Sequence, residues 1–138
     1  MHEQVCDFFR QNDQLGKYLG INVEEVGPGF AKTSLTLRDD LLNGAGMAHG
    51  ATIFALADIA FGAAANSRGE LAIGIEAHVS YIRPGKDGML HAEAHEIGAN
   101  SKTATYKVIV TDEKNTVLAS FQGTAYKKNT HLFDIAGG

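Results

Sequence analysis

The strongest structural signal in the chain is the stretch LLNGAGMAHGATIFALADIAFGAAANS, residues 41–67. Its first ten residues contain three glycines, which break regular structure and let a backbone approach a ligand closely. The remainder, residues 51–67, is rich in alanine and apolar on every face apart from Thr52, Asp58 and the polar end at residues 66–67. A helix that is apolar all round lies inside a protein. The stretch therefore predicts a glycine-rich loop that leads into a buried helix.

The chain that follows this helix changes to a period of two. The alternation covers residues 71–82, 88–97, 103–111 and 117–127, and turn-like residues separate these segments. Before the glycine-rich loop, residues 30–37 show the same rough alternation. Four successive strands with short turns predict an antiparallel meander, which needs apolar cover on one face. We therefore expect an α+β fold in which one long central helix is wrapped by a curved antiparallel sheet.

The length of 138 residues matches one domain, and neither a repeat nor a linker divides the chain. Apolar residues spaced from Val5 to Leu15 predict an N-terminal helix over about residues 1–18, which Gly20 would end. We expect residues 129–138 to be a loosely ordered tail. The sequence thus predicts a single domain over residues 1–138.

The composition argues against several classes of protein. The formal net charge of −4 disfavours general nucleic-acid binding, because phosphate-tracking proteins carry a basic surplus. No stretch is long and apolar enough to cross a bilayer, and the N-terminus lacks the basic start and apolar run of a secretory signal. A single cysteine, Cys6, predicts neither a disulfide framework nor a zinc site. We expect a cytoplasmic protein without nucleic-acid or membrane partners.

Asp58 lies in the middle of the most hydrophobic segment, where an ionised carboxylate without partners is costly. One interpretation is a structural aspartate that pairs with a buried donor, and the other is a functional carboxylate. His49 and Gly50 stand just before the helix, whose first turn presents unpaired N–H groups at the positive end of its dipole. Such fixed donors stabilise the oxyanion of a tetrahedral transition state. These neighbours favour the functional interpretation.

Gly50 and Asp58 of one chain cannot touch the same carbonyl group. Their separation along a helix axis is roughly 12 Å, at a rise of about 1.5 Å per residue, which is far beyond hydrogen-bond reach. Either the two residues are unrelated, or one subunit supplies the glycine and its neighbour the aspartate. Two such helices packed antiparallel about a two-fold axis would form two equivalent shared sites.

Three segments together resemble the PaaI-type hotdog thioesterases: residues 41–69, SYIRPGKDG at residues 80–88 and SFQGTAYKK at residues 120–128. The likeness covers about residues 19–127, and its Asn-Gly, His-Gly and Ala-Asp pattern is fairly specific at these spacings. The resemblance implies a dimer with a continuous sheet, and often a homotetramer built from two dimers. It also implies hydrolysis of an acyl-CoA substrate, without a metal or redox cofactor.

The resemblance also implies roles for particular residues. The aspartate that matches Asp58 is the nucleophile or the general base. The glycine that matches Gly50 polarises the thioester through its N–H, from the opposite subunit. Residues that match Asn43 and His49 position water, the carbonyl or the helix start.

Two positions depart from the family pattern. Ala51 stands where many relatives have a second glycine, which would narrow the approach to the acyl group. Gly74 stands where some relatives have a serine or threonine that holds the attacking water. The positioning of water by a side chain at that point is therefore open.

The family binds the coenzyme A tail with the ends of two strands and the loops beyond them. The matching residues here are Tyr81, Arg83, Pro84, Lys86, Asn100, Ser101, Lys102 and Thr103. Arginine and lysine suit phosphate on physical grounds. The alternative for each of these residues is a solvated turn with ordinary surface charge.

The sequence evidence for a metal site is weaker than the evidence for an acyl-CoA site. His91, Glu93 and His95 alternate along one strand and share one face, a spacing that can hold a divalent metal. Because no further strong ligand lies nearby in sequence, we expect a solvent-facing polar edge and no metal site.

The function expected from the sequence is hydrolysis of acyl-CoA thioesters, with aryl-acetyl or hydroxyphenylacetyl-CoA as candidate substrates. A first alternative is a hotdog enoyl-CoA hydratase or dehydratase, which needs a differently spaced histidine and acid on the central helix. A second is a non-catalytic module that binds acyl-CoA as a sensor. Assays of enoyl-CoA hydration, of thiol release and of ligand binding separate the three.

Overall fold

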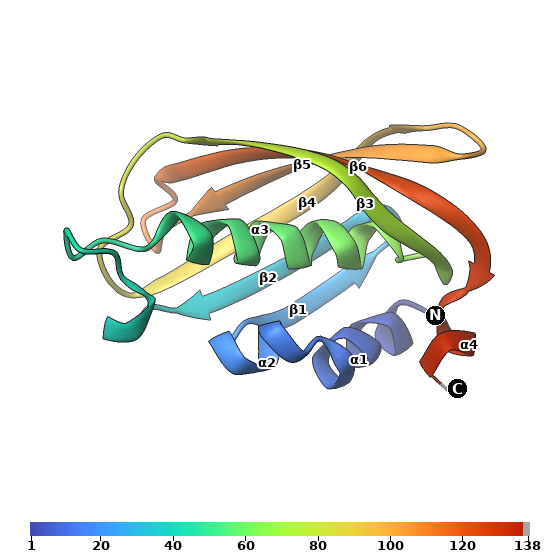
Figure 1. Cartoon of the computed structure of the whole chain (residues 1–138), viewed down its shortest axis with the longest axis horizontal. Coiled ribbons are helices and arrows are strands. Elements are labelled where there is room, and N and C mark those ends of the chain that lie inside the picture. Colours follow the sequence, from blue (N-terminus) through green and yellow to red (C-terminus); the bar gives the residue numbers. More distant parts are fainter. Residues whose placement is uncertain (137–138) are drawn as a thin grey trace.

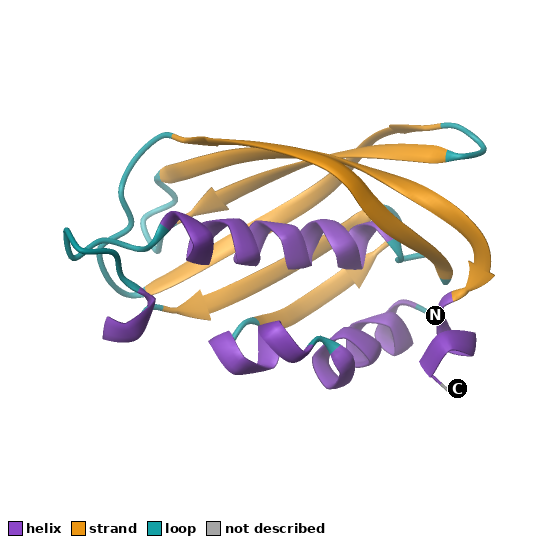
Figure 2. Cartoon of the chain, viewed as in Figure 1, coloured by secondary structure: helices purple, strands orange, loops and turns teal. Residues whose placement is uncertain are grey.

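The centre of the molecule is helix α3, Gly50–Ala65, which lies in the hollow of one curved sheet (Figure 1). The structure is a computed structural model and describes residues 1–136. Within these residues the sheet has six antiparallel strands: β1 Asn22–Gly27, β2 Phe30–Thr36, β3 Glu70–Tyr81, β4 Met89–Ala99, β5 Thr103–Thr111 and β6 Val117–His131. Helix α1, His2–Asn12, packs beside β1, and both α1 and the following α2, Gln14–Leu19, also contact α3 (Figure 2). The expected α+β fold, with one central helix wrapped by an antiparallel sheet, is confirmed.

The strand order is β1-β2-β4-β5-β6-β3, so the expected meander of four strands is only partly right. Strands β4, β5 and β6 are neighbours joined by short turns, whereas β3 pairs with β6 at the far edge. The reason is the connection after β3. Residues 82–88 form a loop too long for a tight hairpin, and this loop carries the chain across to β4, which pairs with β2.

Strand β1 was not predicted, because its alternation is broken. Val23 and Val26 are its buried residues, and a bulge between Val23 and Glu25 shifts the register against β2. A bulge inserts an extra residue, which turns the following side chains to the other face. The period of two is therefore lost over a strand of only six residues.

The N-terminal helix is two helices, α1 His2–Asn12 and α2 Gln14–Leu19. They meet at Asp13, whose extended backbone ends α1 and whose side chain caps α2 by accepting a hydrogen bond from the Gly16 N–H at 2.9 Å. Gly20 ends α2 in the left-handed region, at a φ of 80°, as expected. The single helix predicted over residues 1–18 is therefore wrong at Asp13.

The C-terminal segment also differs from the expected tail. Strand β6 continues to His131, and a short helix, α4 Leu132–Ala136, follows it. Leu132 is 1% exposed, and its N–H donates to the Gly69 carbonyl at 2.7 Å. One buried leucine thus holds this segment to the core, and only residues 137–138 of the predicted tail lie outside the described residues.

Helix α3 buries one side and leaves the other open. Leu56, Ala60 and Ala64 follow one another at a spacing of four residues and are fully buried against the sheet. The Thr33 hydroxyl donates to the Leu56 carbonyl at 2.9 Å, which satisfies that buried polar group. Ala51 and Asp58 are exposed. Among the described residues, no helix is both long and apolar enough to span a membrane.

Candidate active site

The glycine-rich loop before α3 is tied down at several points. The Asn43 side-chain oxygen accepts hydrogen bonds from the Ala45 and Met47 N–H groups, at 2.9 and 3.1 Å. The Ala48 N–H donates to the Gly85 carbonyl at 2.7 Å. The loop is therefore fixed both internally and against the β3–β4 connection. Asn43 acts here by shaping the backbone that leads to the helix.

The first turn of α3 is held from two sides. The His49 Nδ1 accepts a hydrogen bond from the Ala51 N–H at 2.9 Å, so the neutral imidazole carries its proton on Nε2. The Tyr81 hydroxyl donates to the Gly50 carbonyl at 3.1 Å. The peptide between Gly50 and Ala51 is thus fixed at its N–H and its carbonyl. Within residues 1–136 the Gly50 N–H has no acceptor, so it is a free donor at the positive end of the helix.

A pocket of about 370 Å³ lies at this free donor. It is lined by Asn43, Met47, Ala48, Gly50, Ile53, Tyr81, Ile82, Arg83 and Pro84. The pocket therefore brings together five of the residues that the sequence predicted at the site: Asn43, Gly50, Tyr81, Arg83 and Pro84. Lys86 lies apart from them, in a neighbouring hollow that it shares with Pro84 and the turn at residues 112–114.

Asp58 does not line this pocket. It lies two turns further along α3, on the exposed side, as the separation along the helix requires. Partial loss of water contact raises the pKa of its carboxyl group, and the negative charge of Asp13 raises it further. The raised pKa makes this carboxylate a stronger base than an ordinary aspartate.

The other expected contacts for coenzyme A lie at the opposite end of the sheet. Residues 100–102 connect β4 to β5, and Figure 1 shows this turn far from the start of α3. The Asn100 side chain accepts hydrogen bonds from the Lys102 and Thr103 N–H groups at 2.8 Å each, while Ser101 and Lys102 are exposed. One chain therefore does not bring residues 100–103 together with Tyr81 and Arg83.

Comparison with known proteins identifies the family. The family model described as "Thioesterase superfamily" matches residues 45–119. The acyl-coenzyme A thioesterase PaaI of Escherichia coli is 32% identical over 118 residues, which cover 85% of this chain and 84% of that protein. The chain belongs to the thioesterase superfamily. It is a PaaI-type member with the hotdog fold, and hence a thioesterase.

Solved structures of thioesterase relatives agree with this membership. The structure of the E. coli PaaI protein from the phenylacetic acid degradation operon matches with a TM-score of 0.91, at 30% identity, over 94% of this chain and 95% of that one. A mutant of the phenylacetic acid degradation protein PaaI from Thermus thermophilus matches with a TM-score of 0.77, at 37% identity, over 81% and 96%. The likeness to E. coli PaaI thus extends over nearly the whole of both chains.

Packing explains why this thioesterase has a glycine at residue 74. A Cβ at Gly74 would lie 2.8 Å from the Phe61 ring, and one at Gly123 would lie 2.9 Å from the same ring. Phe61 of α3 therefore fills the space that side chains on β3 and β6 would take. A serine or threonine at residue 74 would require Phe61 to move. No such hydroxyl is available here to hold water.

The sequence pattern gave no sign of one charged neighbour of Asp58. Asp13, which acts on Asp58, was placed within a continuous helix and given no role. Its residue type carried a usable signal, since aspartate is a preferred N-cap and often marks a helix start. The alternating His91, Glu93 and His95 remain without further ligands, because no three histidine, cysteine or acidic residues in the described range are placed to hold a metal ion.

Proposed function

We propose that this chain hydrolyses acyl-CoA thioesters to the free acid and coenzyme A, in a site that two chains build together. The Gly50 N–H of one chain binds the thioester carbonyl oxygen, and Asp58 of the other acts on the carbonyl carbon. The observation that carries the proposal is the free Gly50 donor in a pocket that Asp58 of the same chain does not line. A basic carboxylate and an oxyanion donor are the two groups that thioester hydrolysis needs.

Strand β3 supports the pairing of two chains. It is an edge strand of twelve residues, and its Ile73 and Ile75 side chains are 49% and 58% exposed. A long, exposed and apolar edge strand is a template for pairing with another strand. The open side of α3 supports it too, because apart from Asp58 the helix is apolar in composition on that side as well. Two β3 strands paired about a two-fold axis give the continuous sheet of the proposed homodimer.

The chemistry can follow either of two routes. In the first, Asp58 takes a proton from water, the water oxygen adds to the carbonyl carbon, and the oxyanion is held by the Gly50 N–H. Collapse then breaks the carbon–sulfur bond, and the proton passes to the departing thiolate. In the second, the Asp58 carboxylate adds directly, expels the thiolate and forms a mixed anhydride, which water hydrolyses. Both routes give one acid and one thiol from one water.

The coenzyme A tail is proposed to lie along both chains. Arg83 and Lys86 follow β3 near the Gly50 pocket, and both are exposed. A two-fold axis perpendicular to β3 makes the two copies of this strand antiparallel, so residues 100–103 of the second chain come to the end where the first chain holds Arg83. Aryl-acetyl and hydroxyphenylacetyl groups are the proposed acyl groups, on the similarity to E. coli PaaI.

The substitution Asp58→Asn tests this function directly. It keeps the shape of the side chain but removes the base or nucleophile, so thiol release from phenylacetyl-CoA should fall by about 10² to 10⁴-fold. Circular dichroism checks that the variant is folded. Unchanged turnover would remove Asp58 from the mechanism. Single-turnover hydrolysis by the wild type in ¹⁸O-labelled water then tests for direct attack, because label in the Asp58 carboxylate arises only when water opens a mixed anhydride at the Asp58 carbon.

A further inference from the structure

The joint between α1 and α2 lies against α3 beside Asp58. Asp13 forms this joint and caps α2 through the Gly16 N–H. Gly16 packs on the next residue of α3 after Asp58: a Cβ at Gly16 would lie 3.1 Å from Ile59 Cδ1 and 3.2 Å from the Asp13 carboxylate. The glycine permits this close approach of α2 to α3. A second carboxylate, that of Asp13, is therefore fixed on the segment that packs against Ile59, and its negative charge acts on Asp58.

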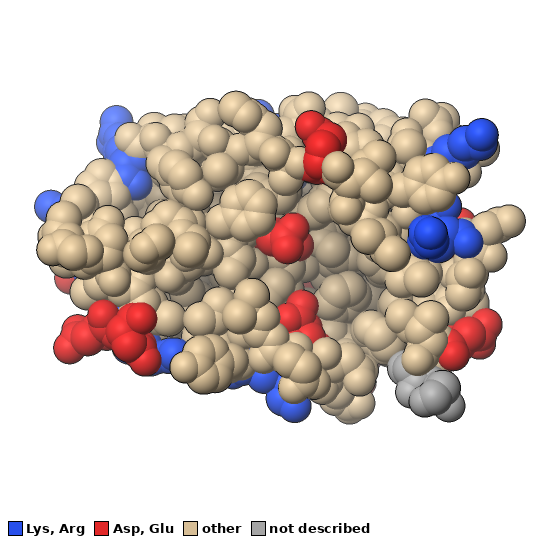
Figure 3. Space-filling model, viewed as in Figure 1, with Lys and Arg blue, Asp and Glu red and all other residues tan. Residues whose placement is uncertain are grey.

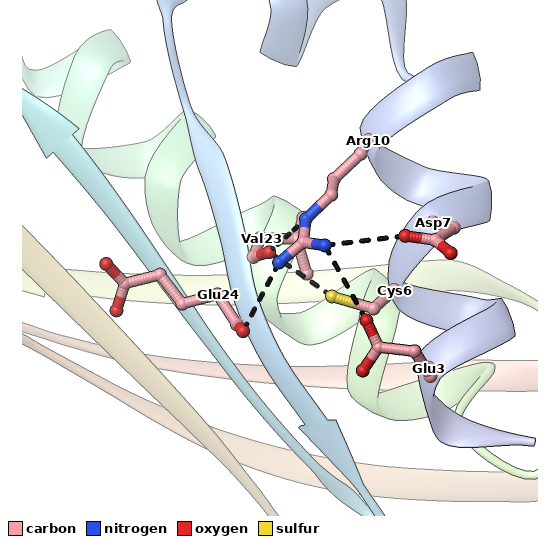
Figure 4. A network of polar contacts seen from close by, with 6 residues as sticks. All are labelled: Glu3, Cys6, Asp7, Arg10, Val23 and Glu24. Carbon is pink, nitrogen blue, oxygen red and sulfur yellow. Dashed lines mark hydrogen bonds and ion pairs between the residues drawn. The ribbon is translucent and has the colours of Figure 1, made fainter.

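Both sides of the joint are anchored, so Asp13 does not lie on a loose arm. On the α1 side, Arg10 donates to the Val23 carbonyl at 2.8 Å and to the Glu24 carbonyl at 3.4 Å, and the Cys6 thiol donates to Val23 at 3.2 Å (Figure 4). On the α2 side, Arg38 donates to the Leu19 carbonyl at 2.9 Å. The two helices are thus tied to the rest of the fold before and after Asp13.

The cations on these helices do not offset the Asp13 charge at Asp58. Arg10 pairs with Glu3 and Asp7, and Lys17 donates to the Gln11 carbonyl at 3.5 Å. Among residues 1–136, Asp13 is the charged group that shifts Asp58. On the face viewed in Figure 3, acidic side chains lie near the middle and Lys and Arg lie toward the rim. The charge of its own chain that acts on Asp58 is therefore the negative charge of Asp13.

We propose that Asp13 is a specificity-determining residue that excludes acyl groups carrying a carboxylate, so that the enzyme accepts uncharged acyl-CoAs. This inference rests on the proposed function. In the bound substrate, the coenzyme A part runs from the carbonyl group into the Gly50 pocket of one chain. The acyl group then extends toward the chain that supplies Asp58. A terminal carboxylate on a short acyl group then faces two fixed negative charges. Such like-charge contact discriminates against the wrong ligand.

The test compares two substrates that differ only in charge, glutaryl-CoA and its monomethyl ester. The wild type should prefer the ester by at least about 100-fold in kcat/KM. Asp13→Asn removes the charge and keeps a good N-cap, so the fold should persist. In this variant the preference should shrink by about 10-fold or more, through faster cleavage of glutaryl-CoA. An unchanged preference in a folded Asp13→Asn protein would overturn the inference.

Two further readouts separate this role from a merely structural one. Removal of the Asp13 charge favours ionised Asp58 and lowers its pKa, so the acidic limb of the kcat/KM profile for the ester should move to lower pH. Asp7→Asn is the matched control, because it removes the same charge from α1 at a carboxylate that faces Arg10. It should leave both the preference and the pH profile unchanged. Equal shifts in the two variants would mean that only net charge matters.

The inference can fail independently of the proposed hydrolysis. If the wild type cleaves the ester while Asp13→Asn alters neither readout, hydrolysis stands and the role of Asp13 is refuted. If the wild type cleaves neither compound, hydrolysis fails, and calorimetry with the two non-cleavable thioether analogues decides the point. Tighter binding of the ester analogue, lost in Asp13→Asn, supports the role of Asp13, and equal binding of both analogues overturns it.

Discussion

The two edge strands of the sheet, β1 and β3, differ in length, in regularity and in how much of them the chain covers. Strand β1 has six residues and a bulge, and α1 lies along it with Arg10 and Cys6 bonded to its carbonyls. Strand β3 has twelve residues and exposes Ile73 and Ile75. Short, bulged and covered edges resist pairing, whereas long apolar edges invite it. The chain thus covers one edge by itself and leaves the other open, where we propose that a second copy pairs.

Charges placed on the open edge strand β3 should have the largest effect, both on the proposed dimer and on activity. The double variant Ile73→Lys and Ile75→Lys puts like charges on both copies of the paired edge, so the proposed dimer should dissociate. The shared site is then lost, and thiol release should fall by at least about 100-fold. Light scattering after size exclusion measures the mass, and a thiol assay measures activity.

The matched control adds the same charge to the other edge. Asn22→Lys with Glu24→Gln also changes the net charge by two, on exposed side chains of β1. Mass and activity should stay at the wild-type values, since surface substitutions of this kind change stability little. If both double variants lost activity equally, the contrast between the edges would have no functional meaning.

Removal of the Arg10 hydrogen bonds to β1 should have an intermediate effect. We expect it to lower stability and to leave activity unchanged. Arg10→Met deletes the donors to the Val23 and Glu24 carbonyls while its side chain still covers apolar surface. The free energy of unfolding should fall by about 1 to 2 kcal/mol, as expected for lost hydrogen bonds to a charged group. Urea unfolding measures this change. A variant that instead lost its dimeric mass would place part of the dimer contact at β1.

The smallest effect is expected where β3 ends, beside the first turn of α3. Tyr81→Phe removes the hydrogen bond to the Gly50 carbonyl and leaves the ring in place. A hydrogen bond of about 1 kcal/mol corresponds to a drop of about 5-fold in kcat/KM. Tyr126→Phe on β6 is the control and should behave as wild type. If Tyr81→Phe matched this control in steady-state kinetics, Tyr81 would have no part in holding the oxyanion donor.

The sequence predicted what depends on local pattern. The buried helix and five of the six strands follow from periodicity and composition within short segments, whereas the shared pocket of Gly50, Tyr81 and Arg83 is a finding of the structure. Strand β1 escaped because its bulge cancels the period of two. The place of β3 at the far edge depends on which strands meet after the chain has crossed the sheet, and no local pattern encodes this.

The candidate site shows the same division. Asp58 stood out because a carboxylate interrupts an apolar helix, whereas Asp13 did not, because its effect arises from the packing of Gly16 on Ile59. Gly74 was read as a missing water ligand, and only the structure gives its packing reason in the Phe61 ring. Contacts between segments far apart in sequence were the part that sequence reasoning could not supply.

In the proposed dimer one chain supplies the acid and the other supplies the donor, and this division of labour can be tested by mixing two inactive variants. One variant carries Asp58→Asn, and the other carries Gly50→Pro, which deletes the N–H at a helix position that tolerates proline. Gly50→Ala is the control for the added carbon, which would meet the Tyr81 ring at 3.3 Å. After the two variants are unfolded together and refolded, hybrid dimers should regain one working site in two. No activity above that of the separate variants would contradict a site shared between chains.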